Sequence, residues 1–204
     1  MPQGTSLIKK PMEINCSHWL FYYLRTTMIT LTRITDTTSS EYRFTEELLT
    51  ATFPREEYRP LHEQRNNTAS NSAFHLMLAS KEGEPVGFIS YWKLHEFCYV
   101  EHLATLPALR GGGIGGAIVE QLKKIADKIV LEAEEPIDEL TTRRIGFYRR
   151  AGFEMCPLPY TQPPYREGDG TLPMQLLFHG CPASSDNFTR AKELIYRNIY
   201  NYKE

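Results

Sequence analysis

Five glycines occupy six consecutive positions in the segment Gly111-Gly112-Gly113-Ile114-Gly115-Gly116, which directly follows Arg110. A stretch typical of a strand (97–105) precedes the segment, and a helical repeat (113–128) follows it. Glycine tolerates positive φ and lets the backbone approach a ligand closely. Free N–H groups at the start of a helix attract an anion, and Arg110 adds a permanent positive charge. The segment therefore predicts a phosphate-binding turn between a strand and a helix.

The glycine spacing fits more than one phosphate ligand. Gly111-x-Gly113-x-x-Gly116 matches the fingerprint of dinucleotide-binding domains. In that fingerprint the first glycine follows the strand at once, whereas five residues, including Pro107, separate Thr105 from Gly111 here. A nucleoside-triphosphate P-loop is excluded, because no Gly-Lys-Ser/Thr follows the glycines. A dinucleotide-dependent oxidoreductase therefore stays as a weaker alternative.

Strand and helix patterns fill the chain after Met28. Strands are expected at 29–34, 74–80, 86–93, 97–105, 129–134, 153–157 and 171–178, and helices at 40–53, 113–128, 139–151 and 186–200, with a further short helix before Asn71. Short loops make the three strands between 74 and 105 antiparallel neighbours. The patterns predict an α+β (mixed α/β) fold, in which a central, twisted, mostly antiparallel sheet of six to seven strands is flanked by helices.

The chain of 204 residues changes character at two points. Residues 1–27 show no clear period and are interpreted as an N-terminal extension outside the core. Residues 28–180 form the expected compact domain, and residues 181–204 an amphipathic helix packed on it. The net charge of −2 gives no reason to expect nucleic acid or a membrane as a partner. Four scattered cysteines without a CxxC pair favour a reducing, cytoplasmic setting.

Two motifs together resemble the GNAT superfamily of N-acetyltransferases. Arg110-x-x-Gly113-x-Gly115 is similar to that family's loop for the pyrophosphate of acyl-CoA, and it follows a strand that ends Leu103-Ala104-Thr105. Farther on, Gly146–Phe153 resembles the aromatic segment that ends the family's next helix. The resemblance covers roughly 28–178 and implies an acyl-CoA N-acyltransferase fold. It also implies acetyl-CoA as co-substrate and a primary amine as acceptor.

The resemblance also assigns residues to the donor site. The expected contacts with the co-substrate are Leu103, Ala104, Thr105, Arg110, Gly111, Gly112, Gly113, Ile114, Gly115 and Gly116. In the family, a backbone N–H near Leu103 or Ala104 holds the thioester carbonyl, and a β-bulge often frees such a donor. The family often has an Asn early in the helix that carries its Tyr, whereas Thr141 and Arg144 stand there in this chain.

Transfer to an amine requires a base that deprotonates the amine and an acid that protonates the leaving thiolate. By resemblance the acid is Tyr148, whose phenol is protonated at neutral pH. Glu101 is the first candidate for the base, followed by Glu132 and Glu134, because all three lie on the strands that border the expected cleft. Each could instead be a solvated charge on the sheet. His102 could serve if its face of the strand, opposite to that of Glu101, is the open one.

The acceptor side is expected in two segments, 54–72 and 157–170. Tyr160–Arg166 forms an aromatic, semi-rigid stretch that could close over a small-molecule or peptide amine. The same stretch could instead be a packed loop or a contact within a homodimer. Glu56, Glu57 and Tyr58 are candidates for amine recognition. No metal is expected, because His95, Cys98 and His102 do not share one face of a strand. A non-catalytic acyl-CoA-binding module is the alternative function.

Overall fold

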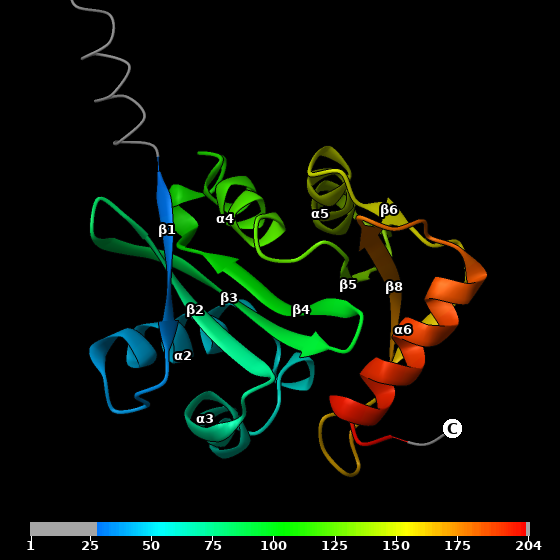
Figure 1. The fold of residues 1–204 in the computed structure, drawn as a ribbon, viewed down its shortest axis with the longest axis horizontal. Helices are drawn as coiled ribbons and strands as arrows, with labels where there is room; N and C mark the ends of the chain where they lie inside the picture. The colour runs from blue at the N-terminus through cyan, green and yellow to red at the C-terminus, as the bar shows by residue number, and fades with distance from the viewer. Residues whose placement is uncertain (1–27, 203–204) are drawn as a thin grey trace, which may run out of the picture.

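The computed structural model describes residues 28–202, in which one central sheet is covered by helices on both faces (Figure 1). The predicted N-terminal extension (1–27) lies outside the described residues. The strands are β1 (Ile29–Ile34), β2 (Phe74–Lys81), β3 (Glu84–Leu94), β4 (Phe97–Thr105), β5 (Ile129–Glu134), β6 (Glu154–Met155), β7 (Tyr160–Gln162) and β8 (Leu172–His179). Their order is β1-β2-β3-β4-β5-β8-β6, and β7 also pairs with β8. Every pair is antiparallel except β4–β5.

The predicted fold class is confirmed, but the sheet has eight strands rather than six or seven. The additional strand is β7, which lies in the segment expected to be an aromatic loop. It was hidden in the sequence because prolines at 163 and 164 follow it at once, and proline removes the backbone donor that a longer strand would need.

A different set of helices covers each face of the sheet. They are α2 (Ser40–Thr52), α3 (Leu61–Ser70), α4 (Ile114–Lys123), α5 (Glu139–Arg150) and α6 (Ser185–Asn198). Side chains of α2 and α6 pack into one hydrophobic core, and side chains of α4 and α5 into the other. No helix within residues 28–202 combines the length and the apolar character needed to cross a bilayer.

Local sequence signals explain where several helices begin and end. The Ser39 hydroxyl accepts a hydrogen bond from the Tyr42 amide at the start of α2. At the start of α5, Asp138 and Thr141 cap each other's backbone amides. Thr141 therefore caps the helix. The predicted helix 113–128 ends early, at Lys123, and Ile125 beyond its end is 56% exposed.

The sheet forks between β4 and β5. Their parallel pairing runs only from Cys98↔Ile129 to Val100↔Leu131. On the other side of β4, the register with β3 jumps between Ser90↔His102 and Tyr91↔Val100, which leaves Glu101 in a β-bulge. This bulge lies where the two strands begin to separate, two residues before Leu103.

Candidate active site

A cleft of about 810 Å³ opens at this fork. Its walls come from the ends of β4 and β5, the glycine loop, and one side of α5. All of the residues predicted to contact the co-substrate line the cleft except Gly112. Tyr148, Glu101, Glu132 and Glu134 line it as well, so residues from four separate segments meet in one space.

The glycine loop turns from β4 into α4 through two left-handed residues. Gly111 and Gly113 have φ values of +84° and +79°, which a residue with a Cβ rarely adopts. Gly113 is the N-cap of α4, so the amides of the first helical turn have no partner within the helix. A Cβ on Gly115 would lie 3.4 Å from the Phe147 ring, which shows how closely α4 and α5 approach. This geometry suits an anion held by backbone amides.

Tyr148 reaches the cleft from α5. Its ring packs edge-on against Phe147 and Phe153, and only 8% of the residue is exposed. Burial raises the pKa of Tyr148 to about 12, although the positive charge of Arg144 opposes the rise. Within residues 28–202 the hydroxyl forms no hydrogen bond. The phenol is therefore protonated at neutral pH and available as a donor.

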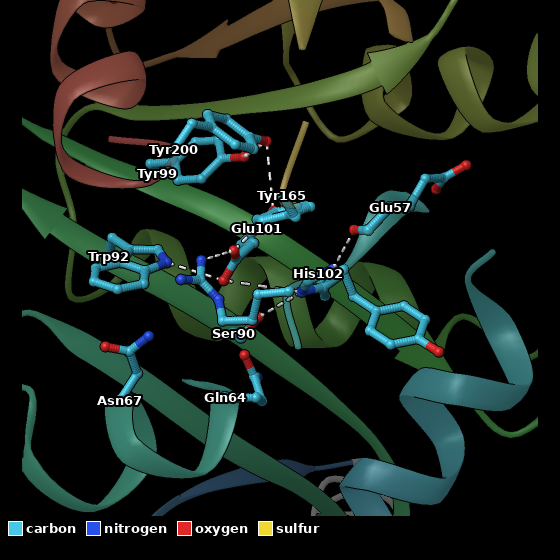
Figure 2. Close-up of polar contacts among 12 residues, drawn as sticks. Glu57, Gln64, Asn67, Ser90, Trp92, Tyr99, Glu101, His102, Tyr165 and Tyr200 are labelled. Atoms are coloured by element: carbon cyan, nitrogen blue, oxygen red, sulfur yellow. Dashed lines mark hydrogen bonds and ion pairs between the residues drawn. The ribbon is translucent and has the colours of Figure 1, made fainter. Parts of the chain in front are cut away.

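Glu101 is fully enclosed, although it borders the cleft. Its side chain has 0% exposure and pairs with Arg59, whose side chain is 5% exposed. Trp92 Nε1 and the Tyr165 hydroxyl donate to it at 2.9 and 2.8 Å (Figure 2). Burial alone would raise the pKa of Glu101, but the positive charge of Arg59, the charge of His102 and the hydrogen bonds that the carboxylate accepts together outweigh burial and hold the pKa below its usual value. Glu101, the first candidate for the base, is thus held in a buried ion pair with Arg59.

Glu132 lies in β5, one residue beyond the last pair with β4, and no cation is paired to it among the described residues. Tyr160 donates to Oε1, and Tyr99 and Tyr200 donate to Oε2 at 2.9 and 2.7 Å. Burial raises the pKa of Glu132 to about 7, against the lowering effect of these hydrogen bonds. A carboxyl with such a pKa exchanges protons at neutral pH, so the geometry ranks Glu132 above Glu101 as a base.

The other two candidates are engaged elsewhere. Glu134 pairs with Arg144 of α5. His102 was expected on the strand face opposite to Glu101. That expectation is wrong, because the bulge at Glu101 places both side chains on the side of α2 and α3 (Figure 2). His102 is 2% exposed and contacts Ser90 Oγ at 3.3 Å and the Glu57 carbonyl at 3.0 Å, and burial lowers its pKa.

The two segments expected to form the acceptor side, 54–72 and 157–170, contact each other. Arg166 donates to the carbonyls of Arg55 and Tyr58 at 2.6 and 2.8 Å, and Arg55 pairs with Asp169 at 3.2 Å. Glu57 lines the cleft from one loop, whereas Gln162 and Tyr165 line it from the other side. The Gln162 side chain is buried and its Nε2 has no hydrogen-bond partner within residues 28–202.

Sequence reasoning missed Arg59, Trp92 and Tyr200. Arg59 lies over the Trp92 ring at 4.9 Å and over the Tyr165 ring at 5.3 Å. Nothing in their spacing along the chain brings these residues together. The one available signal was that Glu101 lies within a strand of mostly buried residues, where a carboxylate requires a cation or several donors nearby.

Comparisons with known proteins agree with this geometry. A profile of the Acetyltransferase (GNAT) family matches residues 37–153. A solved GNAT-family protein from Bacteroides thetaiotaomicron is 42% identical, with a TM-score of 0.81 over 85% of this chain and 99% of that one. Bacillus subtilis YjbC is 28% identical over 120 residues, which cover 57% of this chain and 62% of YjbC. The chain thus spans less than two thirds of that relative's length.

A more distant structure shares the fold. A GNAT-family acetyltransferase from Elizabethkingia anophelis, solved with acetyl-CoA bound, is 20% identical with a TM-score of 0.51, over 75% of this chain and 98% of that one. The forked sheet and its glycine loop define an acyl-CoA N-acyltransferase fold. Because the family profile matches more than half of its length, the chain belongs to the Acetyltransferase (GNAT) family of acyltransferases.

Proposed function

We propose that this chain transfers an acetyl group from acetyl-CoA to a primary amine by direct attack of the amine on the thioester. One observation carries the proposal: a single cleft contains an anion-binding glycine loop, an unengaged phenol at Tyr148, and the Glu132 carboxyl, whose pKa is about 7. These are the donor site, the acid and the base that the reaction requires.

The glycine loop supplies the donor site. Free amides in the first turn of α4 and the Arg110 guanidinium suit the pyrophosphate of coenzyme A. Arg143 and Arg150 of α5 add further positive charge to the same cleft. Gly111 and Gly113 allow the backbone to approach the phosphates without an intervening Cβ. The donor is therefore held by backbone geometry and charge together.

Glu132 and Tyr148 divide the proton transfers. The Glu132 carboxylate takes one proton from the ammonium group, and the free amine attacks the thioester carbonyl carbon. A C–N bond forms, the C–S bond breaks, and the leaving sulfur takes the phenolic proton of Tyr148. The former amine nitrogen, which becomes the amide nitrogen, loses its excess proton to the Tyr148 phenolate and so restores the phenol. Glu132 releases its proton to water. Protons and electron pairs balance, with one proton released for each amide formed.

The acceptor is an amine on a small molecule or a peptide. Glu57 is a half-buried carboxylate that lines the cleft and forms no hydrogen bond through its side chain among the described residues. Burial raises the pKa of Glu57, and the charge of Arg144 limits the rise. A negative group at this position favours a positively charged acceptor over an anionic one.

The test is thiol release from acetyl-CoA in the presence of a panel of amines. Tyr148→Phe should lower turnover about 100-fold, because it removes only the proton donor. The Kd for acetyl-CoA should stay unchanged. Tyr202→Phe is the matched control, since Tyr202 is 40% exposed and does not line the cleft.

A thermal-shift comparison of acetyl-CoA with NAD(P) separates the alternatives. A ligand at 100 times its Kd stabilises a protein by about 2.7 kcal/mol. A larger shift with NAD(P) would contradict the proposal. Binding of acetyl-CoA without thiol release for any amine would favour a non-catalytic acyl-CoA-binding module.

A further inference from the structure

Four tyrosines surround Glu132 and link it to Glu101. Three of them, Tyr99, Tyr160 and Tyr200, donate to the Glu132 carboxylate. The Tyr200 hydroxyl also lies 3.4 Å from that of Tyr165, which donates to Glu101 (Figure 2). We call the three donors to Glu132 the tyrosine cage.

The cage is assembled from segments that are far apart in the chain. Tyr99 comes from β4, Tyr160 from β7, and Tyr200 from the residues that follow α6. Only Tyr99 lies inside residues 37–153, where the family profile matches. The Tyr200 ring also packs against the Tyr165 ring, with centroids 4.8 Å apart, so its hydroxyl is held in place on two sides. Two of the three donors thus lie outside the residues that the family profile matches.

We infer that Tyr200 is a positioning residue, which orients the Glu132 carboxylate and stabilises its charged form so that it can accept the proton of the acceptor amine. The inference rests on the proposed function. A hydrogen bond donated to a carboxylate favours the charged form, and a carboxyl buried without such donors would stay protonated.

Among the described residues, no cation stabilises the charged form of Glu132. Burial raises the pKa of Glu132, hydrogen bonds from Tyr160, Tyr200 and Tyr99 lower it, and the charge of Glu101 raises it. Arg59, which belongs to the same network of side chains, pairs with Glu101 instead. The charged state of Glu132 therefore depends on the phenols of the cage.

The experiment titrates Glu132 in the full chain by NMR of ¹³C-labelled glutamate side chains, with the signal assigned by its loss in Glu132→Gln. Tyr200→Phe keeps the ring and removes the donor, so the Glu132 midpoint should rise by about 1 pH unit. Tyr160→Phe, which removes the donor to the other oxygen, should raise the midpoint as well. Tyr202→Phe, two residues further along the same segment, should leave it unchanged.

The pH dependence of kcat/KM with an accepted amine is the second measurement. For Tyr200→Phe the acidic limb should move upward by the same amount as the Glu132 midpoint. The rate should return to within about 3-fold of the unsubstituted protein above that limb, because Glu132 is then ionised in both. The Kd for acetyl-CoA should not change.

Two outcomes would overturn the inference: an unmoved Glu132 midpoint in Tyr200→Phe, or an equal loss of rate at every pH with an unmoved limb. Failure of the proposed function has a different signature. In that case the unsubstituted protein releases no thiol with any amine, whatever the NMR titration shows.

Discussion

Replacement of Arg59 by Met tests the buried ion pair directly. Met keeps much of the apolar contact with the rings of Trp92 and Tyr165 but removes the charge that Glu101 faces. With side-chain exposures of 5% and 0%, the pair has almost no contact with water. Removal of one partner from a buried pair costs about 3–5 kcal/mol. The total stability of a folded domain is only about 5–15 kcal/mol, so the effect is large.

Urea unfolding, followed by circular dichroism, measures this loss. With a slope of about 2–3 kcal/mol per molar urea, the midpoint should fall by roughly 1–2 M. Arg59→Met with Glu101→Gln should recover part of the loss, because Gln carries no charge that needs a partner and still accepts one hydrogen bond. The double-mutant cycle should show a coupling of at least ~2 kcal/mol.

The pH dependence gives a second check with a definite sign. In the unsubstituted protein the pKa of Glu101 is lowered, so its contribution to stability is present above the unfolded pKa and is lost as the pH falls through the folded pKa. In Arg59→Met, burial dominates and raises the pKa of Glu101. The cost of burying an unpaired Glu101 carboxylate therefore destabilises this variant at neutral pH, and it disappears as the carboxylate becomes protonated toward about pH 4. A loss below ~1 kcal/mol, or a difference between the two proteins that does not shrink with acid, would refute the reasoning.

Two further substitutions test the donor site and the packing of the sheet. Arg110→Gln should raise the Kd for acetyl-CoA about 10-fold in isothermal titration, because a charged hydrogen bond to phosphate is lost. Arg149→Gln, outside the cleft, should leave the Kd unchanged. Gly180→Ala should lower the free energy of unfolding by at least ~2 kcal/mol in thermal denaturation, because its Cβ would lie 1.7 Å from the Asp127 carbonyl oxygen at a φ of +75°. Gly170→Ala, with open space around its Cβ, is the control and should be nearly neutral.

The sequence anticipated elements whose pattern is local. The three antiparallel strands between 74 and 105 are present with bounds close to those expected, and the helix after Gly113 begins where it was expected but ends five residues early. Alternation along β4 failed from His102 onward, because the bulge at Glu101 adds a residue and reverses the side on which each later residue lies. A bulge depends on the register with β3, which no local pattern reports.

The candidate site was predictable only where one segment forms it. The glycine loop is a single continuous motif, and all but one of its expected residues line the cleft. The choice between Glu101 and Glu132 depended instead on partners 42 and 68 residues away in the chain, Arg59 and Tyr200. Long-range contacts of this kind arise from the topology, so the two carboxylates looked equivalent in the sequence.

The fork between β4 and β5 gives this sheet two internal edges. Beyond Val100 and Leu131 each strand keeps a hydrogen-bonded neighbour on its outer side only, β3 for one and β8 for the other. An unpaired edge at the border of a sheet invites another chain to pair with it. Here both edges border a cleft of about 810 Å³, a volume far smaller than that of a folded protein. Under the proposed function, the backbone groups left unpaired in the middle of the sheet would be free to pair with the amide groups in the pantetheine arm of coenzyme A.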